Sequence, residues 1–83
     1  MKLKKVLEKV EYSIINGNTN TEITDICYDS RKIKEGCLFI CLVGSSFDGH
    51  DYIDSVIEKG AKAILVEKDI TREDITIIKV NNT

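Results

Sequence analysis

Residues 37–66 read CLFICLVGSSFDGHDYIDSVIEKGAKAILV, and this stretch decides the fold. Its first seven residues are all apolar, as is typical of a strand that is covered on both faces. Residues 51–59 then carry apolar side chains at helical spacing, and Gly60 follows where a left-handed cap ends a helix. A second apolar run occupies residues 61–66. Strand, loop, helix and strand at this spacing predict a βαβ unit with parallel strands.

The flanking residues extend this unit into a small sheet. Apolar residues at helical spacing predict a helix from Leu3 to Val10. Further strands are predicted over residues 12–16, 23–28 and 76–80, with a turn at residues 16–18 and one helical turn over residues 71–74. The first two of these strands read as a hairpin-like pair, which makes the sheet mixed. We therefore expect one α/β domain over residues 1–83, with a small mixed, partly parallel sheet flanked by helices.

Charge and hydropathy exclude several classes of protein. The net charge is −2, and the four N-terminal lysines interleave with Glu8 and Glu11, so no clustered basic face is available for nucleic acid. No apolar run approaches the roughly 20 residues of a membrane span, and the charged start does not fit a signal peptide. We expect a cytoplasmic protein without nucleic-acid or membrane partners.

The cysteines point to the same compartment. Cys27, Cys37 and Cys41 are odd in number, lack Cys-x-x-Cys spacing and lie in or beside apolar runs. Free thiols that act as small hydrophobic side chains are typical of a reducing environment. We therefore expect three free cysteines, not a disulfide or a metal site.

No self-sufficient catalytic motif occurs in the sequence. There is no Gly-x-x-x-x-Gly-Lys-Ser/Thr phosphate loop, and no Gly-x-Gly-x-x-Gly follows a predicted strand. A single histidine without a nucleophile elbow argues against a Ser-His-Asp triad. We expect no catalytic residue, no metal and no cofactor within these 83 residues.

Two polar clusters follow predicted strands. Tyr28-Asp29-Ser30-Arg31 ends the second strand, and Gly44-Ser45-Ser46-Phe47-Asp48-Gly49-His50 follows the apolar run. In open α/β sheets, ligands bind beyond the carboxyl ends of strands. Converging loops would offer backbone amides, hydroxyls and the aromatic faces of Tyr28 and Phe47. That combination suits a nucleobase.

Simpler interpretations of the same residues stay open at this stage. Asp29 and Arg31 could pair with each other or cap neighbouring backbone, and Ser30 could be an ordinary turn residue. Asp48, His50 and Asp51 could ligate a metal ion, since proteins use all three side-chain types for that purpose. A turn followed by a helix N-cap is the interpretation we favour for this second group.

Both clusters resemble signatures of the Mur ligase family. Residues 28–39 are similar to the "DSR … G-x-L/A-F" signature of its N-terminal domain, and residues 44–61 resemble its "G-x-x-x-DGH-x-F/Y-I … GA" segment. The two motifs stand in the expected order and separation, and together they cover roughly residues 23–66. The opening Met-Lys-Leu-Lys-Lys-Val-Leu is more similar to members that form the tripeptide precursor than to those that add D-alanyl-D-alanine.

The resemblance implies a substrate and a set of contacts. The N-terminal domain would anchor the UDP end of UDP-N-acetylmuramoyl-L-alanyl-D-glutamate, a precursor of peptidoglycan. Ser30 would contact the uracil, Tyr28 would pack near it, and Ser45, Ser46 and Phe47 would line the nucleotide. The residues implied to brace these loops are Asp29, Arg31, Asp48, Gly49 and His50.

The resemblance also implies what these residues leave to the rest of a ligase. A central domain would bind ATP and Mg²⁺, and a C-terminal domain would complete the amino-acid site. Both would lie outside these 83 residues and would be their partners in the same protein, so the chain alone is expected to be inactive. Two other functions stay open: a stand-alone protein-interaction module, with the sheet edge as its partner surface, and a metal-binding domain.

Overall fold

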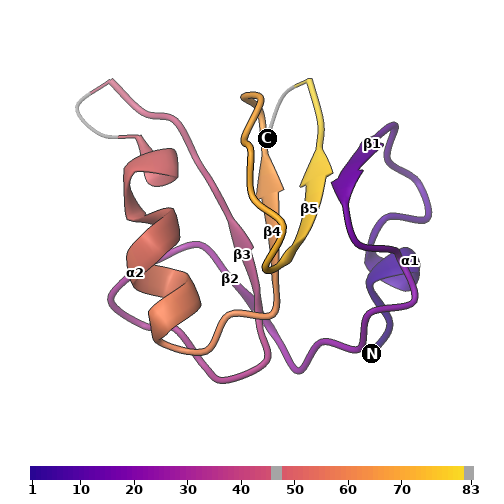
Figure 1. Ribbon diagram of the computed structural model, residues 1–83, viewed down its shortest axis with the longest axis horizontal. Helices are drawn as coiled ribbons and strands as arrows, with labels where there is room; N and C mark the ends of the chain where they lie inside the picture. Colours follow the sequence, from indigo (N-terminus) through magenta and orange to yellow (C-terminus); the bar gives the residue numbers. More distant parts are fainter. Residues whose placement is uncertain (46–47, 82–83) are drawn as a thin grey trace.

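A five-stranded sheet with the order β1-β5-β4-β3-β2 forms the centre of the computed structural model, which describes residues 1–45 and 48–81. Its strands are β1 (Ser13–Asn16), β2 (Ile26–Cys27), β3 (Leu38–Ile40), β4 (Ala63–Val66) and β5 (Thr76–Lys79). The helices are α1 (Leu3–Val6), the 3-10 helix η1 (Gly49–Tyr52) and α2 (Ile53–Glu58). Figure 1 shows α1 and α2 on opposite sides of the sheet.

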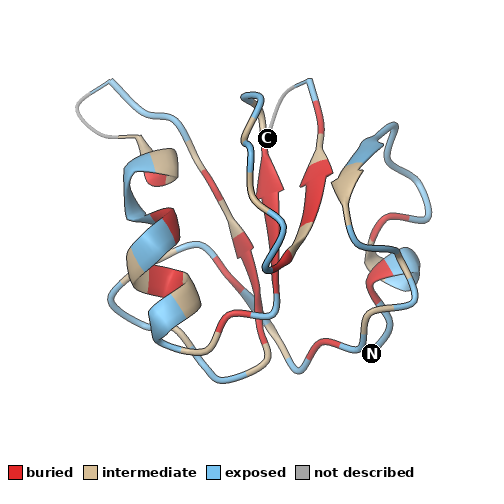
Figure 2. Cartoon of the chain, in the orientation of Figure 1, coloured by how far each residue is buried: buried red, intermediate tan, exposed pale blue. Residues whose placement is uncertain are grey.

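The βαβ unit predicted from residues 37–66 is confirmed. β3 and β4 pair in parallel, with Leu38 opposite Ala63 and Ile40 opposite Leu65, and α2 crosses between them. Every residue of β4 is buried, because helices cover both faces of the sheet (Figure 2). Alternate side chains serve the two faces. Ile64 packs with the α2 side, whereas Leu65 packs with the α1 side.

The end of α2 is fixed by the cap that the sequence predicts. Gly60 has a φ of +110°, and its N–H donates to the carbonyl of Ile57 at 3.1 Å. The N–H of Ala61 donates to the carbonyl of Val56 at 3.0 Å, and both of these side chains are buried. This pair of bonds is a Schellman motif with its apolar contact. It turns the chain directly into β4.

The mixed character of the sheet is confirmed, but the predicted hairpin is wrong. β1 pairs antiparallel with β5, and β1 and β2 lie at opposite edges of the sheet. Residues 19–23 pair instead with the N-terminus: Leu3 donates to the carbonyl of Thr21 at 2.9 Å, and Ile23 donates to that of Met1 at 2.7 Å. Ile23 thus belongs to this pairing with the N-terminus, and the second strand is limited to β2, not to the predicted residues 23–28.

Other elements are shorter than the sequence predicts. The first helix ends at Val6, not Val10, because the N–H groups of Glu8 and Val10 donate only three residues back, to the carbonyls of Lys5 and Leu7, as in turns and not as in an α-helix. Tyr12 stands outside β1, and the strand predicted over residues 37–43 is reduced to β3. The helical turn predicted over residues 71–74 is absent. In that segment the Arg72 guanidinium bridges Asp54 of α2 and Asp74, and these ion pairs hold an irregular connection against α2.

Candidate functional site

A cleft of about 480 Å³ lies where β2 and β3 end. β2 and β3 are neighbouring parallel strands, so their carboxyl ends meet at one edge of the sheet. Ligands of open α/β sheets bind at such an edge. The cleft thus brings the first polar cluster together with Gly49 of the second. Its lining residues are Tyr28, Asp29, Ser30, Arg31, Phe39, Leu42, Gly49 and Tyr52.

The first wall of the cleft is a loop tied by Asp29 and Arg31. The Arg31 guanidinium donates to both oxygens of the Asp29 carboxylate, each at 3.1 Å. The N–H of Arg31 donates to the same carboxylate at 2.9 Å. These bonds, with the side-chain pair contributing most, lower the pKa of Asp29 from 3.8 to about 2. The pairing left open by the sequence is therefore present, and it fixes the loop that carries Ser30.

Ser30 and Tyr28 are presented differently by this loop. Ser30 is half-buried, and its backbone carbonyl accepts a hydrogen bond from Lys59 Nζ at 2.9 Å, which ties the loop to the end of α2. Tyr28 is 67% exposed, so its ring can change position over the cleft without disturbing the core. A hydroxyl on a tethered loop beside an exposed ring is an arrangement that can read the edge of a planar ligand and cover its face.

The opposite wall is the η1 turn, which Asp48 caps as the turn-and-cap interpretation predicts. Asp48 accepts from the N–H of His50 at 2.9 Å, pairs with His50 Nδ1 at 2.6 Å, and forms an ion pair with Lys68. The ion pair with Lys68, followed by these two His50 contacts, holds the pKa of Asp48 well below its ordinary value. The carboxylate is ionised and fully engaged.

Gly49 makes the close approach that this wall requires. Its N–H donates to the carbonyl of Leu42 at 2.7 Å. A Cβ at this position would lie 2.8 Å from the backbone nitrogen of Leu42 and 2.9 Å from Cys41 Cα. Any side chain would therefore push η1 away from the end of β3. Glycine is required here because of this contact, not because of its backbone angles.

Three lining residues were not among the sequence-based candidates. Phe39 and Leu42 belong to the apolar run, where they were assigned to the core, and they form the floor. Tyr52 is 43% exposed and supplies a second exposed aromatic ring, beside that of Tyr28. A signal for it exists in the sequence, since Tyr52 lies off the apolar stripe of the helix. An aromatic residue on a polar helical face beside a candidate loop is a candidate contact.

The remaining nucleotide-lining candidates stay predictions. Ser45 is exposed and does not line the cleft formed by the described residues. Ser46 and Phe47 lie outside the residues that the structure describes. The aromatic face expected from Phe47 is therefore not placed, and the aromatic residues at the described cleft are Tyr28, Phe39 and Tyr52.

In the second cluster, the ring nitrogens of His50 that could bind a metal ion already have other partners. His50 Nδ1 faces Asp48, and His50 Nε2 accepts the N–H of Glu67 at 3.1 Å, so both ring nitrogens are engaged. Within residues 1–45 and 48–81, no group of three His, Cys, Asp or Glu side chains is placed to hold a metal. In the same residues, no helix has the length and apolar character needed to cross a bilayer.

The cysteines are free and buried, as the sequence predicts. Burial raises the pKa of Cys37 to about 11, with the neighbouring Cys27 thiol adding to the effect, and burial raises the pKa of Cys41 to about 12. Thiols with such pKa values stay protonated near neutral pH and are poor nucleophiles. They belong to the core.

Comparison with known proteins identifies relatives over the whole chain. Residues 22–82 match the model of the family described as "Mur ligase family, catalytic domain". UDP-N-acetylmuramoyl-L-alanyl-D-glutamate–2,6-diaminopimelate ligase from Clostridium tetani is 52% identical over 100% of this chain, which spans 18% of that protein. The ligase with the same name from Clostridium perfringens is 45% identical over 100% of this chain and 17% of its own length.

Solved structures share the fold. MurF from Acinetobacter baumannii aligns with a TM-score of 0.68 and 35% identity over 76% of this chain and 14% of its own. The MurF ligase from Thermotoga maritima in complex with ADP aligns with a TM-score of 0.61 and 35% identity over 69% of this chain and 13% of its own. The chain thus spans less than a fifth of each of these four proteins.

Proposed function

Since this chain belongs to the Mur ligase family, we propose that it anchors the uridine end of a UDP-N-acetylmuramoyl-peptide within a ligase that builds peptidoglycan precursors. The observation that carries this proposal is the cleft at the carboxyl ends of β2 and β3. Its volume of about 480 Å³ falls within the usual range of small-ligand pockets.

The chemistry of the cleft suits a uridine ring. Tyr28 and Tyr52 offer aromatic faces, and Phe39 and Leu42 give an apolar floor. Ser30 supplies a hydroxyl that can donate to a carbonyl oxygen or accept from an N–H. A uracil ring presents both kinds of group on its edge. Arg31, exposed at the rim, uses Nε and Nη2 for Asp29, and its other guanidinium N–H groups can donate to the oxygens of a diphosphate beside the base.

The substrate in this proposal is UDP-N-acetylmuramoyl-L-alanyl-D-glutamate, and the amino acid to be joined is 2,6-diaminopimelate. Its support is the name shared by relatives that are 38–52% identical over the whole chain. The D-alanyl-D-alanine-adding alternative has weaker support, since the MurF structures are 34–35% identical over about three quarters of the chain or less. The residues that select the amino acid would lie in other parts of the ligase.

ATP and Mg²⁺ do not fit the residues of this chain. The sequence has no Walker-type phosphate loop, and the described residues provide no metal cluster. We propose that central and C-terminal domains of the ligase hold both groups and complete the reaction. The chain alone would then bind nucleotide weakly and catalyse nothing. Its free cysteines support a reducing compartment, and the cytoplasm is our proposed location.

An NMR titration of the ¹⁵N-labelled 83-residue chain tests the proposal. UDP-N-acetylmuramoyl-L-alanyl-D-glutamate is expected to give saturable shifts centred on Tyr28–Arg31 and Tyr52, and ATP is expected to give none there. Ser30→Ala should weaken binding by about tenfold, the value of one hydrogen bond. Ser13→Ala, on the far edge strand, is the matched control.

Two results would contradict the proposal. A well-dispersed spectrum without shifts at roughly millimolar ligand, the weak end of specific binding, would leave an interaction module as the better account. ATP hydrolysis by the purified chain would show that it is more than an anchor.

A further inference from the structure

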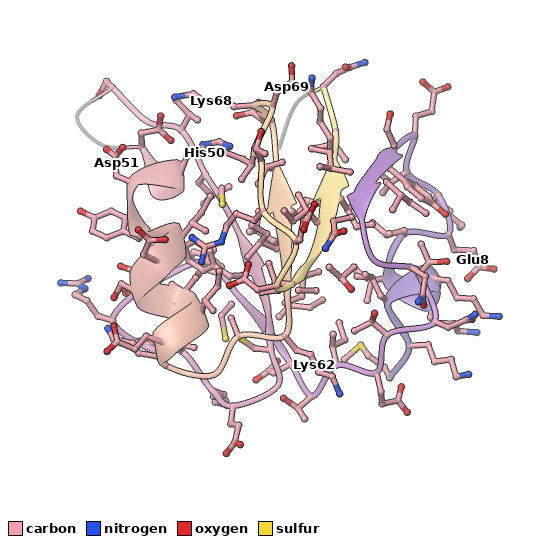
Figure 3. All side chains as sticks on the ribbon, viewed as in Figure 1. Glu8, His50, Asp51, Lys62, Lys68 and Asp69 are labelled. Carbon is pink, nitrogen blue, oxygen red and sulfur yellow. The ribbon has the colours of Figure 1, made fainter. Side chains whose placement is uncertain are left out.

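The His50 ring connects two segments that lie far apart in the sequence. It projects from η1 and its side chain is only 5% exposed. Nδ1 lies 2.6 Å from Asp48 Oδ1, and Nε2 lies 3.1 Å from the backbone nitrogen of Glu67, which directly follows β4. In Figure 3 the ring points from η1 toward the segment that carries Lys68. This contact joins one wall of the cleft to the centre of the sheet.

The partners of the ring determine where its proton lies. A backbone N–H can only donate, so Nε2 must be the acceptor in the bond with Glu67. The proton of a neutral imidazole therefore sits on Nδ1 and is donated to Asp48. Lys68 binds the other oxygen of the same carboxylate, so that Asp48 is held from both sides. The ring has one orientation and one tautomer that satisfy every contact.

The same turn shapes the cleft. Gly49, next to His50, is bonded to Leu42, two residues beyond the end of β3, and Tyr52 lies within one turn of it. η1 is a single 3-10 turn, which has too few internal hydrogen bonds to hold its own position. Besides the Gly49–Leu42 bond, the Asp48–Lys68 ion pair and its continuation into α2, the bond from Glu67 to His50 attaches the turn to the residue that directly follows β4, the most buried strand of the sheet.

We propose that His50 is a positioning residue of the uridine cleft, which acts by binding the Glu67 N–H and so holding Gly49 and Tyr52 in place. This inference rests on the proposed function. His50 touches no reacting group and does not line the cleft. Its effect on a bound nucleotide is transmitted through the η1 turn.

Two substitutions of His50 distinguish its bond to Glu67 from its bond to Asp48. In His50→Gln the side-chain oxygen can reach the place of Nε2 and accept the Glu67 N–H. In His50→Asn the amide can replace Nδ1 at Asp48 but is too short to reach Glu67. We expect His50→Gln to bind UDP within about threefold of the unchanged chain and His50→Asn to bind about tenfold more weakly, the effect of one lost hydrogen bond. Equal affinities in both variants would overturn the proposal.

Measurements without nucleotide keep the inference separate from the proposed function. The chain has one histidine, so a long-range ¹H–¹⁵N spectrum reports on this ring alone. Nε2 should resonate as an unprotonated ring nitrogen, and a protonated Nε2 would refute the arrangement even if both variants fail to fold. Glu67 amide exchange should accelerate in His50→Asn only, while the Val80 amide, bonded to Val66 at 2.9 Å, stays protected. If both NMR results are as expected but UDP does not bind, the proposed function is wrong, whereas the His50–Glu67 contact is confirmed.

Discussion

The ion pair between Asp29 and Arg31 sets the shape of the loop that carries Ser30, and its contribution depends on pH. The folded pKa of Asp29, about 2, is below its ordinary value of 3.8. Folding therefore favours the ionised form. The contribution of the pair to the stability of the folded state is complete above about pH 4 and is lost as the pH falls through 2. Near neutral pH the loop should keep its shape.

Carboxyl ¹³C shifts followed from pH 6 to pH 1 measure the pKa of Asp29 in the folded chain directly. The Asp29 midpoint is expected near pH 2, and Arg31→Met should move it up toward the ordinary value, because both the side-chain pair and its charge are lost. Asp74, whose pKa is lowered by the separate pair with Arg72, is an internal control and should not move. An Asp29 midpoint that Arg31→Met leaves unchanged would show that the pair does not form in solution.

At the scale of single elements, the α2 cap links the crossover helix to two strands. Gly60 ends the helix with positive φ, and its carbonyl accepts the N–H of Gly36 at 2.7 Å, just before β3. The preceding Lys59 reaches back to Ser30 at the cleft. Gly60 thus ends α2, binds the residue before β3 and directly follows Lys59, which holds the Ser30 loop.

Gly60→Ala should destabilise the chain by about 1–3 kcal/mol. The φ of +110° is unfavourable for alanine, and a Cβ would lie 3.1 Å from Glu35 Cα. A urea unfolding curve followed by circular dichroism gives the change in midpoint. Glu58→Ala, exposed on the same helix, should stay within about 0.5 kcal/mol of the unchanged chain. Equal midpoints for the two variants would show that the cap does not limit stability.

At the scale of the whole molecule, the sheet lies between two hydrophobic cores, one on each face, and supplies side chains to both. β4 contributes buried side chains to the cores on both faces of the sheet. Among the strands of the described residues, it alone is buried at every position. A chain of this length has a stability of roughly 4–12 kcal/mol at the usual value per residue. Losing one large side chain from β4 therefore removes a substantial fraction of the total.

Ile64→Ala should cost about 2–5 kcal/mol, because Ile64 is completely buried and its loss leaves a cavity. Ile14→Ala removes the same atoms from edge strand β1, where the residue is 47% exposed, and should cost about 1 kcal/mol or less. Thermal melts of both variants give the comparison. Similar losses in the two variants would mean that the edge strand matters to the fold as much as the centre.

Local patterns in the sequence determined much of this arrangement. The apolar run, the helical stripe and Gly60 lie next to one another along the chain, and they were enough to predict the βαβ unit. The polar residues at the ends of two neighbouring parallel strands predicted the place of the cleft. The contacts of individual side chains with a nucleotide remain predictions, and Ser46 and Phe47 fall outside the described residues.

Only the tertiary structure decided how distant segments pair. β1 joins β5, more than 60 residues away, whereas residues 19–23 pair with the N-terminus and the next strand, β2, joins β3. Tyr52 enters the cleft only once η1 is docked on the end of β3, and the His50 bond to Glu67 spans 17 residues. Sequence periodicity reports which face of an element is apolar, and it carries no information on which element covers that face. Pairing is decided by the competition among all apolar faces and free backbone groups at once, which the folded molecule alone resolves.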